Sequence, residues 1–345
     1  MTCNDVVLVG AGLAAQRCAE TLRARGFDGP IRMIGAEPHP PYDRPPLSKE
    51  LLGTAPKAPG GAAPEQHHGA PLLRPLGWHD EHGIDLFLGD AAVALEDRRV
   101  RLESGARVPF GKVLVATGAR PRTIPGLDDA LTLRTLDDAI RLRERLTEGA
   151  RLAIVGAGFV GLEVAATARE RGVDVTVFEL APAPLARVLG PRIGEWFARL
   201  HRGRGVDLRL GAAFENGPFD AVLVAVGAVP DVEWAGDTRR PDVFVAGDAT
   251  GSQHWEAAAR QGADAARAML GLPPLPPAID SVWSDQHGIR IHVLGHPTGE
   301  PVIEEQSFDR LVAWFPDGAV LANAPELLPA ARARLRQPRE EIAAA

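Results

Sequence analysis

The feature that most constrains this chain is a glycine-rich fingerprint that occurs twice, at residues 7–15 and 153–161. In each copy an apolar stretch predicts a buried parallel strand, the first glycine allows a tight turn, and the second lets the backbone approach a pyrophosphate. A helix then begins, and its free N–H groups favour an anion. The residues expected to contact two dinucleotides are Gly10, Gly12, Leu13, Ala14 and Ala15 in the first copy and Gly156, Gly158, Phe159, Val160 and Gly161 in the second.

Each fingerprint is followed by a carboxylate at the end of the next predicted strand: Glu37 after residues 31–34, and Glu179 after residues 175–178. A glutamate at this position accepts hydrogen bonds from a ribose diol and repels a 2′-phosphate, so the second site is expected to take NADH rather than NADPH. Glycine-rich turns also arise for packing reasons alone, but two copies with strand, spacing and acid in place predict two dinucleotides. Such a pair indicates a resident flavin and a visiting nicotinamide, because hydride must pass between two redox rings.

Composition agrees with a soluble enzyme of more than one domain. The 345 residues are 45% hydrophobic and carry a net charge of -7, which argues against nucleic acid as a partner. No apolar run reaches the roughly 18 residues of a membrane span, and no charged-then-apolar leader is seen. We therefore expect a cytoplasmic protein that does not bind membranes. No feature of the sequence specifies an oligomeric state.

Cysteine and lysine are both scarce. Cys3 and Cys18 form neither a C-x-x-C nor a C-x₄-C pair, so electrons are not expected to pass through a protein disulfide. Cys18 is expected to be a small buried thiol on the first fingerprint helix. Lys49 closes a proline-rich segment, residues 41–49, that also contains Arg44. These two cations either face a pyrophosphate or flavin ring or lie on a solvated turn.

Seven blocks, in order along the chain, resemble the oxygenase-coupled ferredoxin reductases of the putidaredoxin reductase and rubredoxin reductase type. The blocks are P-Y-D-R-P-P-L-S-K at residues 41–49, A-T-G-A-R-P-R at 116–122, G-A-G-F-V-G-L-E at 156–163, V-A-V-G-A-V-P at 224–230, V-A-G-D-A at 245–249, H-W-E-A at 254–257 and V-W-S-D-Q at 282–286. The resemblance implies an FAD-dependent NADH:ferredoxin reductase.

The resemblance also implies roles for individual residues. Glu37 would hold the adenosine half of FAD together with the first fingerprint, and Asp248 its ribityl chain or pyrophosphate. Lys49 would pair with Glu163 beside the isoalloxazine ring, and these two are the implied catalytic residues. Trp283 would stack near the flavin or nicotinamide. The remaining implied cofactor-binding residues are Arg44, Ala116, Thr117, Gly118, Arg122, Gly227, Gly247, Trp255 and Glu256.

The expected fold class is α/β, with two Rossmann-like, glutathione-reductase-like domains and a small α+β C-terminal domain. Residues 1–112 and 237–271 would form the FAD domain, residues 113–236 the NADH domain, and residues 278–345 the C-terminal domain. A strand pair is predicted at residues 85–88 and 100–102, and a loop without metal at His67-His68. In the C-terminal domain we expect antiparallel strands at residues 289–294, 311–315 and 319–322, and a helix at residues 325–336.

The predicted NADH domain departs from the family pattern at two places. Residues 211–219 and 235–241 replace longer stretches, the first of which contains a small β-meander in the family. The fingerprint and its strands are present, so NADH affinity is the property that the contraction puts in question.

The predicted function is hydride transfer from NADH to tightly but non-covalently bound FAD, followed by single-electron transfer to a ferredoxin that feeds an oxygenase such as a cytochrome P450. An acidic [2Fe-2S] ferredoxin would dock on a local positive patch, for which Arg310, Arg332, Arg334 and Arg336 are candidates, with the flavin domain's own arginines as the alternative. Two other functions share this layout. An NADH oxidase or peroxidase needs a reactive cysteine, and a flavin scaffold resembling apoptosis-inducing factor would turn over NADH slowly.

Overall fold

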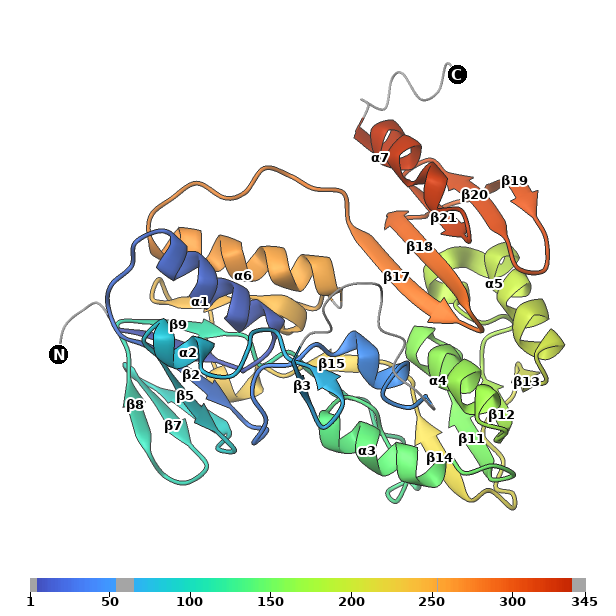
Figure 1. Cartoon of the computed structure of the whole chain (residues 1–345), viewed down its shortest axis with the longest axis horizontal. Coiled ribbons are helices and arrows are strands. Elements are labelled where there is room, and N and C mark those ends of the chain that lie inside the picture. Colours follow the sequence, from blue (N-terminus) through green and yellow to red (C-terminus); the bar gives the residue numbers. More distant parts are fainter. Residues whose placement is uncertain (1–4, 54–64, 253, 337–345) are drawn as a thin grey trace. The chain divides into compact units, whose positions relative to one another are not determined.

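The structure, a computed structural model, describes residues 5–53, 65–252 and 254–336. The chain divides into two compact units, each assembled from separated segments (Figure 1). Unit 1 comprises Met1–Pro46, Ala58–Arg120 and Ala228–Pro277, and unit 2 comprises Leu47–Lys57, Pro121–Gly227 and Ala278–Ala345. The short strands β10 (Ala119–Pro121) and β15 (Ala228–Pro230) pair with each other, and each lies at one of the points where the chain passes from one unit to the other.

Unit 1 is built on a five-stranded parallel sheet. Its strands, in order across the sheet, are β16 (Val243–Val245), β9 (Lys112–Val115), β1 (Val6–Val9), β2 (Ile31–Gly35) and β5 (Ile84–Leu88). Side chains alternate between the two faces, so Val6 and Leu8 enter one apolar cluster while Val7 and Val9 enter another. Because both faces are buried, the central strand is apolar at every position.

Two helices cover the first face of this sheet. The helices α1 (Leu13–Ala24) and α6 (Trp255–Met269) lie side by side over it (Figure 1). They approach closely because Gly262 has no side chain: a Cβ there would lie 2.1 Å from the carbonyl oxygen of Ala14. The short helix α2 (Trp78–Glu81) packs beside β5.

A three-stranded antiparallel sheet covers the second face. It consists of β6 (Ala92–Glu96), β7 (Arg99–Leu102) and β8 (Arg107–Pro109). The predicted pairing of residues 85–88 with residues 100–102 is wrong, although both strands exist. The first belongs to β5 and pairs in parallel with β2, whereas the second belongs to β7 and pairs with β6 and β8.

The predicted loop at His67-His68 is also only half right. The two-residue strands β3 (Gln66–His67) and β4 (Ala70–Pro71) pair as an antiparallel hairpin. His68 lies in the turn between them, with a φ of 50°. His67 lies against His39, with Nε2 and Nδ1 separated by 3.1 Å. No group of three or more metal-ligating side chains is found in the described parts of the chain.

Unit 2 contains a second parallel sheet, of four strands. Their order is β13 (Asp207–Leu210), β12 (Asp174–Glu179), β11 (Arg151–Val155) and β14 (Ala221–Val224). Its helices are α3 (Leu136–Arg145), α4 (Phe159–Glu170) and α5 (Ala186–Gly203). A capping box between Thr135 and Asp138 begins α3. Between β13 and β14 the chain forms no strand, at the place where the sequence is contracted.

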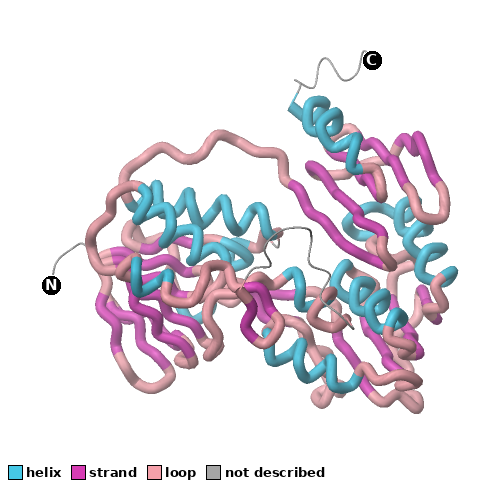
Figure 2. The backbone as a smooth tube through the Cα atoms, in the orientation of Figure 1, coloured by secondary structure: helices cyan, strands magenta, loops and turns pink. Residues whose placement is uncertain are grey.

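The C-terminal part of unit 2 is a five-stranded antiparallel sheet. Its order is β17 (Ser281–Gln286), β18 (Ile289–Gly295), β21 (Gly318–Ala322), β20 (Leu311–Phe315) and β19 (Val302–Gln306). The predicted helix at residues 325–336 is divided into η4 (Pro325–Leu327) and α7 (Leu328–Arg336). Helix α7 lies beside the strands of this sheet (Figure 2), and its buried residue Ala331 belongs to their apolar cluster. Two parallel Rossmann-like sheets and this antiparallel sheet confirm the predicted fold class.

None of the helices in the described segments is long and apolar enough to cross a membrane.

A pair of histidines, one buried and one half-buried, lies between α5 and the turn after β17. The side chain of His201 is fully buried, and its Nε2 lies 2.9 Å from Oε1 of Gln286. His287 lies 3.2 Å away, between its Nε2 and Nδ1 of His201. Burial disfavours the charged ring and lowers the pKa of His201 to about 4. The ring is therefore neutral at pH 7.

We predict that acid destabilises the protein through His201. The unfolded chain takes up a proton near pH ~6.5, whereas the folded ring does not until pH about 4. Stability is therefore fully present above pH ~6.5 and falls as the pH drops toward 4, by about 2 kcal/mol for this one ring at pH 5. Urea unfolding measures the free energy of unfolding at pH 7 and at pH 5. The loss between the two pH values should be about 2 kcal/mol smaller in His201→Gln than in the unaltered protein. The same substitution at the exposed His296 is the control. An unchanged pH dependence in His201→Gln would contradict the prediction.

Candidate functional site

The first fingerprint forms a tight turn in unit 1 at which two glycines carry no side chain. Gly10 has a φ of 114°, and a Cβ there would lie 2.1 Å from the carbonyl oxygen of Ala116. Gly12 is the N-cap of α1 and offers no side-chain cap, while nothing lies within 4 Å of the position its Cβ would take. The first N–H groups of α1 therefore have no side-chain cap, and such free N–H groups are what a pyrophosphate requires. Leu13, Ala14 and Ala15 form the first turn of this helix.

Glu37 follows β2 and belongs to a small polar cluster. Its carboxylate accepts a hydrogen bond from the hydroxyl of Tyr42 at 2.6 Å and pairs with Arg44 at 2.7 Å. Burial acts to lower the pKa of Arg44, but interactions with Tyr42, Glu37 and Asp248 outweigh it and raise that pKa. The proline-rich segment thus holds Arg44 against Glu37, the residue predicted to bind the ribose. Sequence reasoning had not assigned a partner to Tyr42.

Asp248 lies in η3 (Gly247–Thr250), which leads toward α6. Gly247 has a φ of 72°, and a Cβ there would lie 3.0 Å from that of Ala14, so this turn packs on the first fingerprint helix. Trp255 begins α6 and donates from Nε1 to the carboxylate of Asp43 at 2.7 Å, and Glu256 lies in the same first turn. Unit 1 therefore brings its predicted FAD residues to the N-terminal ends of α1 and α6.

Hydrogen bonds hold the segments that contain the blocks at residues 116–122 and 224–230. The hydroxyl of Thr117 donates to the carbonyl oxygen of Asp231, whose N–H donates in turn to the carbonyl of Gly118 at 3.0 Å. In unit 2 the N–H of Arg122 donates to the carbonyl oxygen of Gly227 at 2.9 Å. These hydrogen bonds join the two segments to each other, so Thr117, Gly118, Arg122 and Gly227 stabilise the fold. Their predicted contacts with the cofactor stay a prediction.

The second fingerprint repeats this geometry in unit 2. Gly156 has a φ of 108°, and a Cβ there would lie 2.6 Å from the carbonyl oxygen of Ala225. Gly158 is the N-cap of α4, again without a side-chain cap. Gly161 allows the helix to pack on the turn, since a Cβ there would lie 2.3 Å from the carbonyl oxygen of Gly156. Phe159 and Val160 form the first residues of α4, and Val160 is exposed.

Glu179, at the end of β12, is oriented by the backbone. One carboxylate oxygen accepts the N–H of Ala157, inside the fingerprint turn, and the other accepts the N–H of Ala181, both at 2.8 Å. The carboxylate is thereby fixed at the rim of the glycine-rich turn. Its neighbour in sequence, Leu180, is 75% exposed and brings no positive charge.

Glu163 is a buried carboxylate on α4 that gathers several donors in unit 2. It forms an ion pair with Lys49, with Nζ 2.8 Å from Oε2, and it accepts hydrogen bonds from the hydroxyls of Ser48 and Ser284. The pairing of Lys49 with Glu163 was implied by the family resemblance, whereas the two serines were not singled out. Both belong to quoted blocks, L-S-K and W-S-D-Q, so their presence beside those motifs was the available signal. Trp283 precedes Ser284 on β17 and so points to the other face of that strand.

Cys18 lies on the buried side of α1 as a free thiol, and desolvation raises its pKa. A buried thiol of this kind is unreactive. Cys3 lies outside the described residues. In the described part of the chain, therefore, no cysteine is available for redox chemistry.

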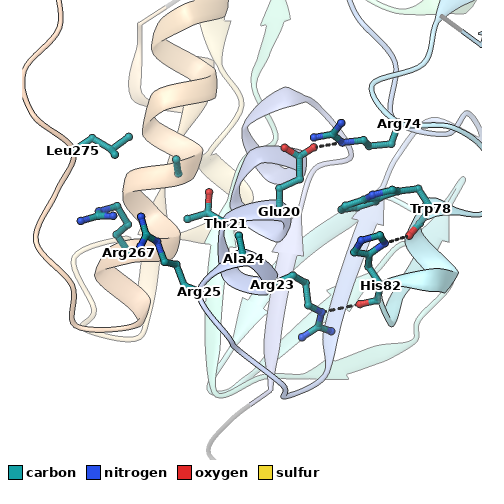
Figure 3. Close-up of a pocket in the computed structure, with 11 residues that line it drawn as sticks. Glu20, Thr21, Arg23, Ala24, Arg25, Arg74, Trp78, His82, Arg267 and Leu275 are labelled. Atoms are coloured by element: carbon teal, nitrogen blue, oxygen red, sulfur yellow. Dashed lines mark hydrogen bonds and ion pairs between the residues drawn. The ribbon is translucent and has the colours of Figure 1, made fainter.

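A cavity of about 710 Å³ lies in unit 1 at the C-terminal end of α1 (Figure 3). It does not coincide with the fingerprint turn, which lies at the other end of that helix, and it contains none of the predicted cofactor residues. Arg74 lies over the ring of Trp78 and pairs with Glu20 at 2.7 Å. The residues that line it are Glu20, Thr21, Arg23, Ala24, Arg25, Arg74, Trp78, His82, Ala263, Arg267 and Leu275.

Comparison with known proteins identifies the family. Residues 4–262 match the family described as pyridine nucleotide-disulphide oxidoreductase. The anthranilate 1,2-dioxygenase system ferredoxin–NAD(+) reductase component of Burkholderia cepacia is 36% identical over 345 residues, covering 86% of this chain and 82% of that protein. The 3-phenylpropionate/cinnamic acid dioxygenase ferredoxin–NAD(+) reductase component of Photorhabdus laumondii is 33% identical, covering 92% of this chain and 91% of that protein.

Solved structures agree. The covalent putidaredoxin reductase–putidaredoxin complex contains a chain that matches with a TM-score of 0.83 and 26% identity, over 99% of this chain and 98% of that one. The resemblance to oxygenase-coupled ferredoxin reductases predicted from the sequence blocks is confirmed by these relatives. With two intact glycine-rich turns and a family match over most of its length, the chain belongs to the pyridine nucleotide-disulphide oxidoreductase family.

Proposed function

We propose that the chain is an FAD-dependent NADH:ferredoxin reductase of an oxygenase system, located in the cytoplasm. The observation that carries the proposal is the pair of open, uncapped glycine turns, one in each unit, each with a glutamate after the neighbouring strand. FAD, when bound, accepts a hydride and returns its electrons one at a time, which is what a one-electron carrier such as a ferredoxin requires. The names of the relatives support the same electron acceptor.

Unit 1 fits FAD in its charge as well as its shape. The open turn at Gly12 would receive the pyrophosphate, and Glu37 and Asp248 would accept hydrogen bonds from ribose and ribityl hydroxyls. Arg44, held against Glu37, would place a cation beside the anionic cofactor. These contacts are hydrogen bonds and ion pairs, so we expect tight but non-covalent binding.

Unit 2 fits NADH, with Gly158 under the pyrophosphate and Glu179 on the adenosine ribose. The Lys49–Glu163 pair would orient the reacting ring, Lys49 by its three donors and Glu163 by holding Lys49 in place. Hydride transfer needs close, aligned approach and little acid–base help, so positioning is the main task of these side chains.

The alternatives predict different kinetics. An oxidase or peroxidase would need a reactive thiol, which the buried Cys18 cannot supply. A flavin scaffold would bind both cofactors but react slowly. Mixing the purified flavoprotein with NADH under argon distinguishes them, since fast bleaching of the flavin supports the reductase and slow bleaching the scaffold.

We predict that the isolated protein is yellow and releases intact FAD when denatured. The first fingerprint turn and Asp248 belong to one unit, and the N-terminus of α1 has no side-chain cap, so the residues expected to hold the adenosine and pyrophosphate of FAD lie together. Absorbance of the native protein and of the supernatant after heat denaturation measures this. Folded protein that stays colourless when FAD is added would contradict it.

We predict a preference for NADH over NADPH. Glu179 is fixed at the rim of the turn, where it would bond the 2′-hydroxyl and repel a 2′-phosphate. Losing the hydrogen bonds and adding repulsion should cost at least about 2 kcal/mol, or roughly thirtyfold in kcat/KM. The preference should weaken in Glu179→Ala and persist in Glu148→Ala, an exposed glutamate of the same unit. Equal kcat/KM values for the two cofactors in the unaltered protein would rule this role out.

The structure narrows the candidates for ferredoxin docking. Arg310 pairs with Glu305 at 2.8 Å and with Glu326 at 2.7 Å, which makes it a weaker candidate than an arginine without an acidic neighbour, and its role in docking stays a prediction. Arg334 lies over the ring of Trp314. Arg332 and Arg336 remain exposed on α7.

We predict that reversing Arg332 and Arg336 to glutamate slows ferredoxin-dependent cytochrome reduction by about tenfold at low salt, because rim charges steer association. The loss should shrink at high salt, while reduction of ferricyanide by NADH stays unchanged. Arg25→Glu, at the cavity in unit 1, is the comparison variant. A loss confined to Arg25→Glu would place docking on the arginines of unit 1 instead.

A further inference from the structure

The carboxylate of Glu163 is the end of a longer chain of hydrogen bonds in unit 2. Ser284 donates from its hydroxyl to Oε1 of Glu163 at 2.6 Å, and Gln286 donates from Nε2 to the hydroxyl oxygen of Ser284 at 2.9 Å. The two residues are two positions apart on β17, so their side chains lie on the same face of the strand.

The chain continues across to α5 through the histidine pair. Nε2 of His201 lies 2.9 Å from Oε1 of Gln286, and Nδ1 of His201 lies 3.2 Å from Nε2 of His287. Glu163 is 4% exposed, Ser284 and Gln286 are 1% exposed and His201 is 0% exposed, whereas His287 is half-buried. We call Ser284, Gln286, His201 and His287 the relay.

The chemistry of the groups gives the relay one direction. An ionised carboxylate only accepts, so Ser284 must donate to Glu163 and must itself accept from the amide nitrogen of Gln286. The amide oxygen is then left to accept from Nε2–H of His201. A neutral ring has one donor and one acceptor, so Nδ1 of His201 accepts from Nε2–H of His287.

Both rings are neutral at pH 7, as this arrangement requires. Burial lowers the pKa of His201 to about 4. Burial, followed by the neighbouring His201, Arg204 and Arg169, lowers the pKa of His287 to about 3. The two arginines therefore act with burial against protonation at the outer end of the relay.

We propose that the relay orients Glu163 toward Lys49, so that Gln286 and His201 are positioning residues for the Lys49–Glu163 pair. Every donor in the relay points toward the carboxylate, and aligned hydrogen bonds polarise and strengthen one another. The inference rests on the proposed function only in assigning the Lys49–Glu163 pair to the reacting ring. A consequence specific to the relay is that the charge on Glu163 fixes the tautomer of His201, two side chains away.

The first test reads that tautomer directly. Nitrogen-15 NMR of the flavoprotein labelled at histidine distinguishes a protonated ring nitrogen from an unprotonated one. We expect Nε2–H at both His201 and His287 in the unaltered protein. In Glu163→Gln the end group can donate as well as accept, and in Ser284→Ala the relay is cut, so the Nε2–H population of His201 should fall in both. The Nδ1–H tautomer at His201, or one tautomer unchanged in all three proteins, would overturn the proposal.

The second test measures flavin reduction by NADH in a stopped-flow instrument. Gln286→Met should lower the limiting rate about tenfold at an unchanged dissociation constant for NADH, because Glu163 loses its orientation. His201→Leu should also lower the limiting rate. His201→Gln should keep most of the rate of the unaltered protein, because its amide can still donate to Gln286.

The matched control lies in unit 1. His79 is likewise buried, with Nε2 2.8 Å from Oε1 of Gln16, so His79→Leu breaks a similar pair that is not part of the relay. Its rate should stay unchanged. Equal losses in His79→Leu and His201→Leu would reduce the effect to general destabilisation and refute the relay. If NADH fails to reduce the unaltered protein, the proposed function falls, while the tautomer measurement still tests the relay.

Discussion

Both units depend on one close approach, that of a glycine to the carbonyl end of the adjacent strand. Gly10 meets the carbonyl of Ala116 and Gly156 that of Ala225 at distances where no side-chain carbon fits. This contact draws the turn against the sheet and sets where each helix begins. A helix N-terminus without a side-chain cap follows from it, and so does the capacity for an anionic ligand. Alanine at either position would separate turn from strand and displace the site with it.

Glu163 is held by a different kind of constraint, because its charged side chain is buried. A carboxylate taken out of water is costly unless a cation and further donors surround it. Lys49 supplies the cation, and hydroxyls from Ser48 and Ser284 supply donors from two distant segments of the chain. The burial of this one group therefore ties the proline-rich segment and β17 to α4.

The local features of this chain were predictable from its own residues, whereas its long-range contacts were not, apart from the Lys49–Glu163 pair that the family resemblance implied. The fingerprint strands and the C-terminal strands follow from apolar patterning and glycine spacing within a few residues. Strand partners do not, which is why β5 was wrongly paired with β7. Arg310 looked like an available cation because its two glutamates come from different elements. His201 and Gln286 are separated by 85 positions, and neither residue alone indicates the other.

The discontinuity of unit 1 has a consequence for how the protein is made. The sheet of unit 1 gains its edge strand from β16, and α1 gains its partner from α6, both of which follow the parallel sheet of unit 2 in the sequence. During synthesis from the N-terminus, β1 and α1 must wait until residue 269 has emerged before their apolar surfaces are covered. The four-stranded sheet of unit 2 is complete by residue 224. The segment that comes second in the sequence is thus able to fold first on the ribosome, and the late strand β16 completes the sheet of unit 1 last.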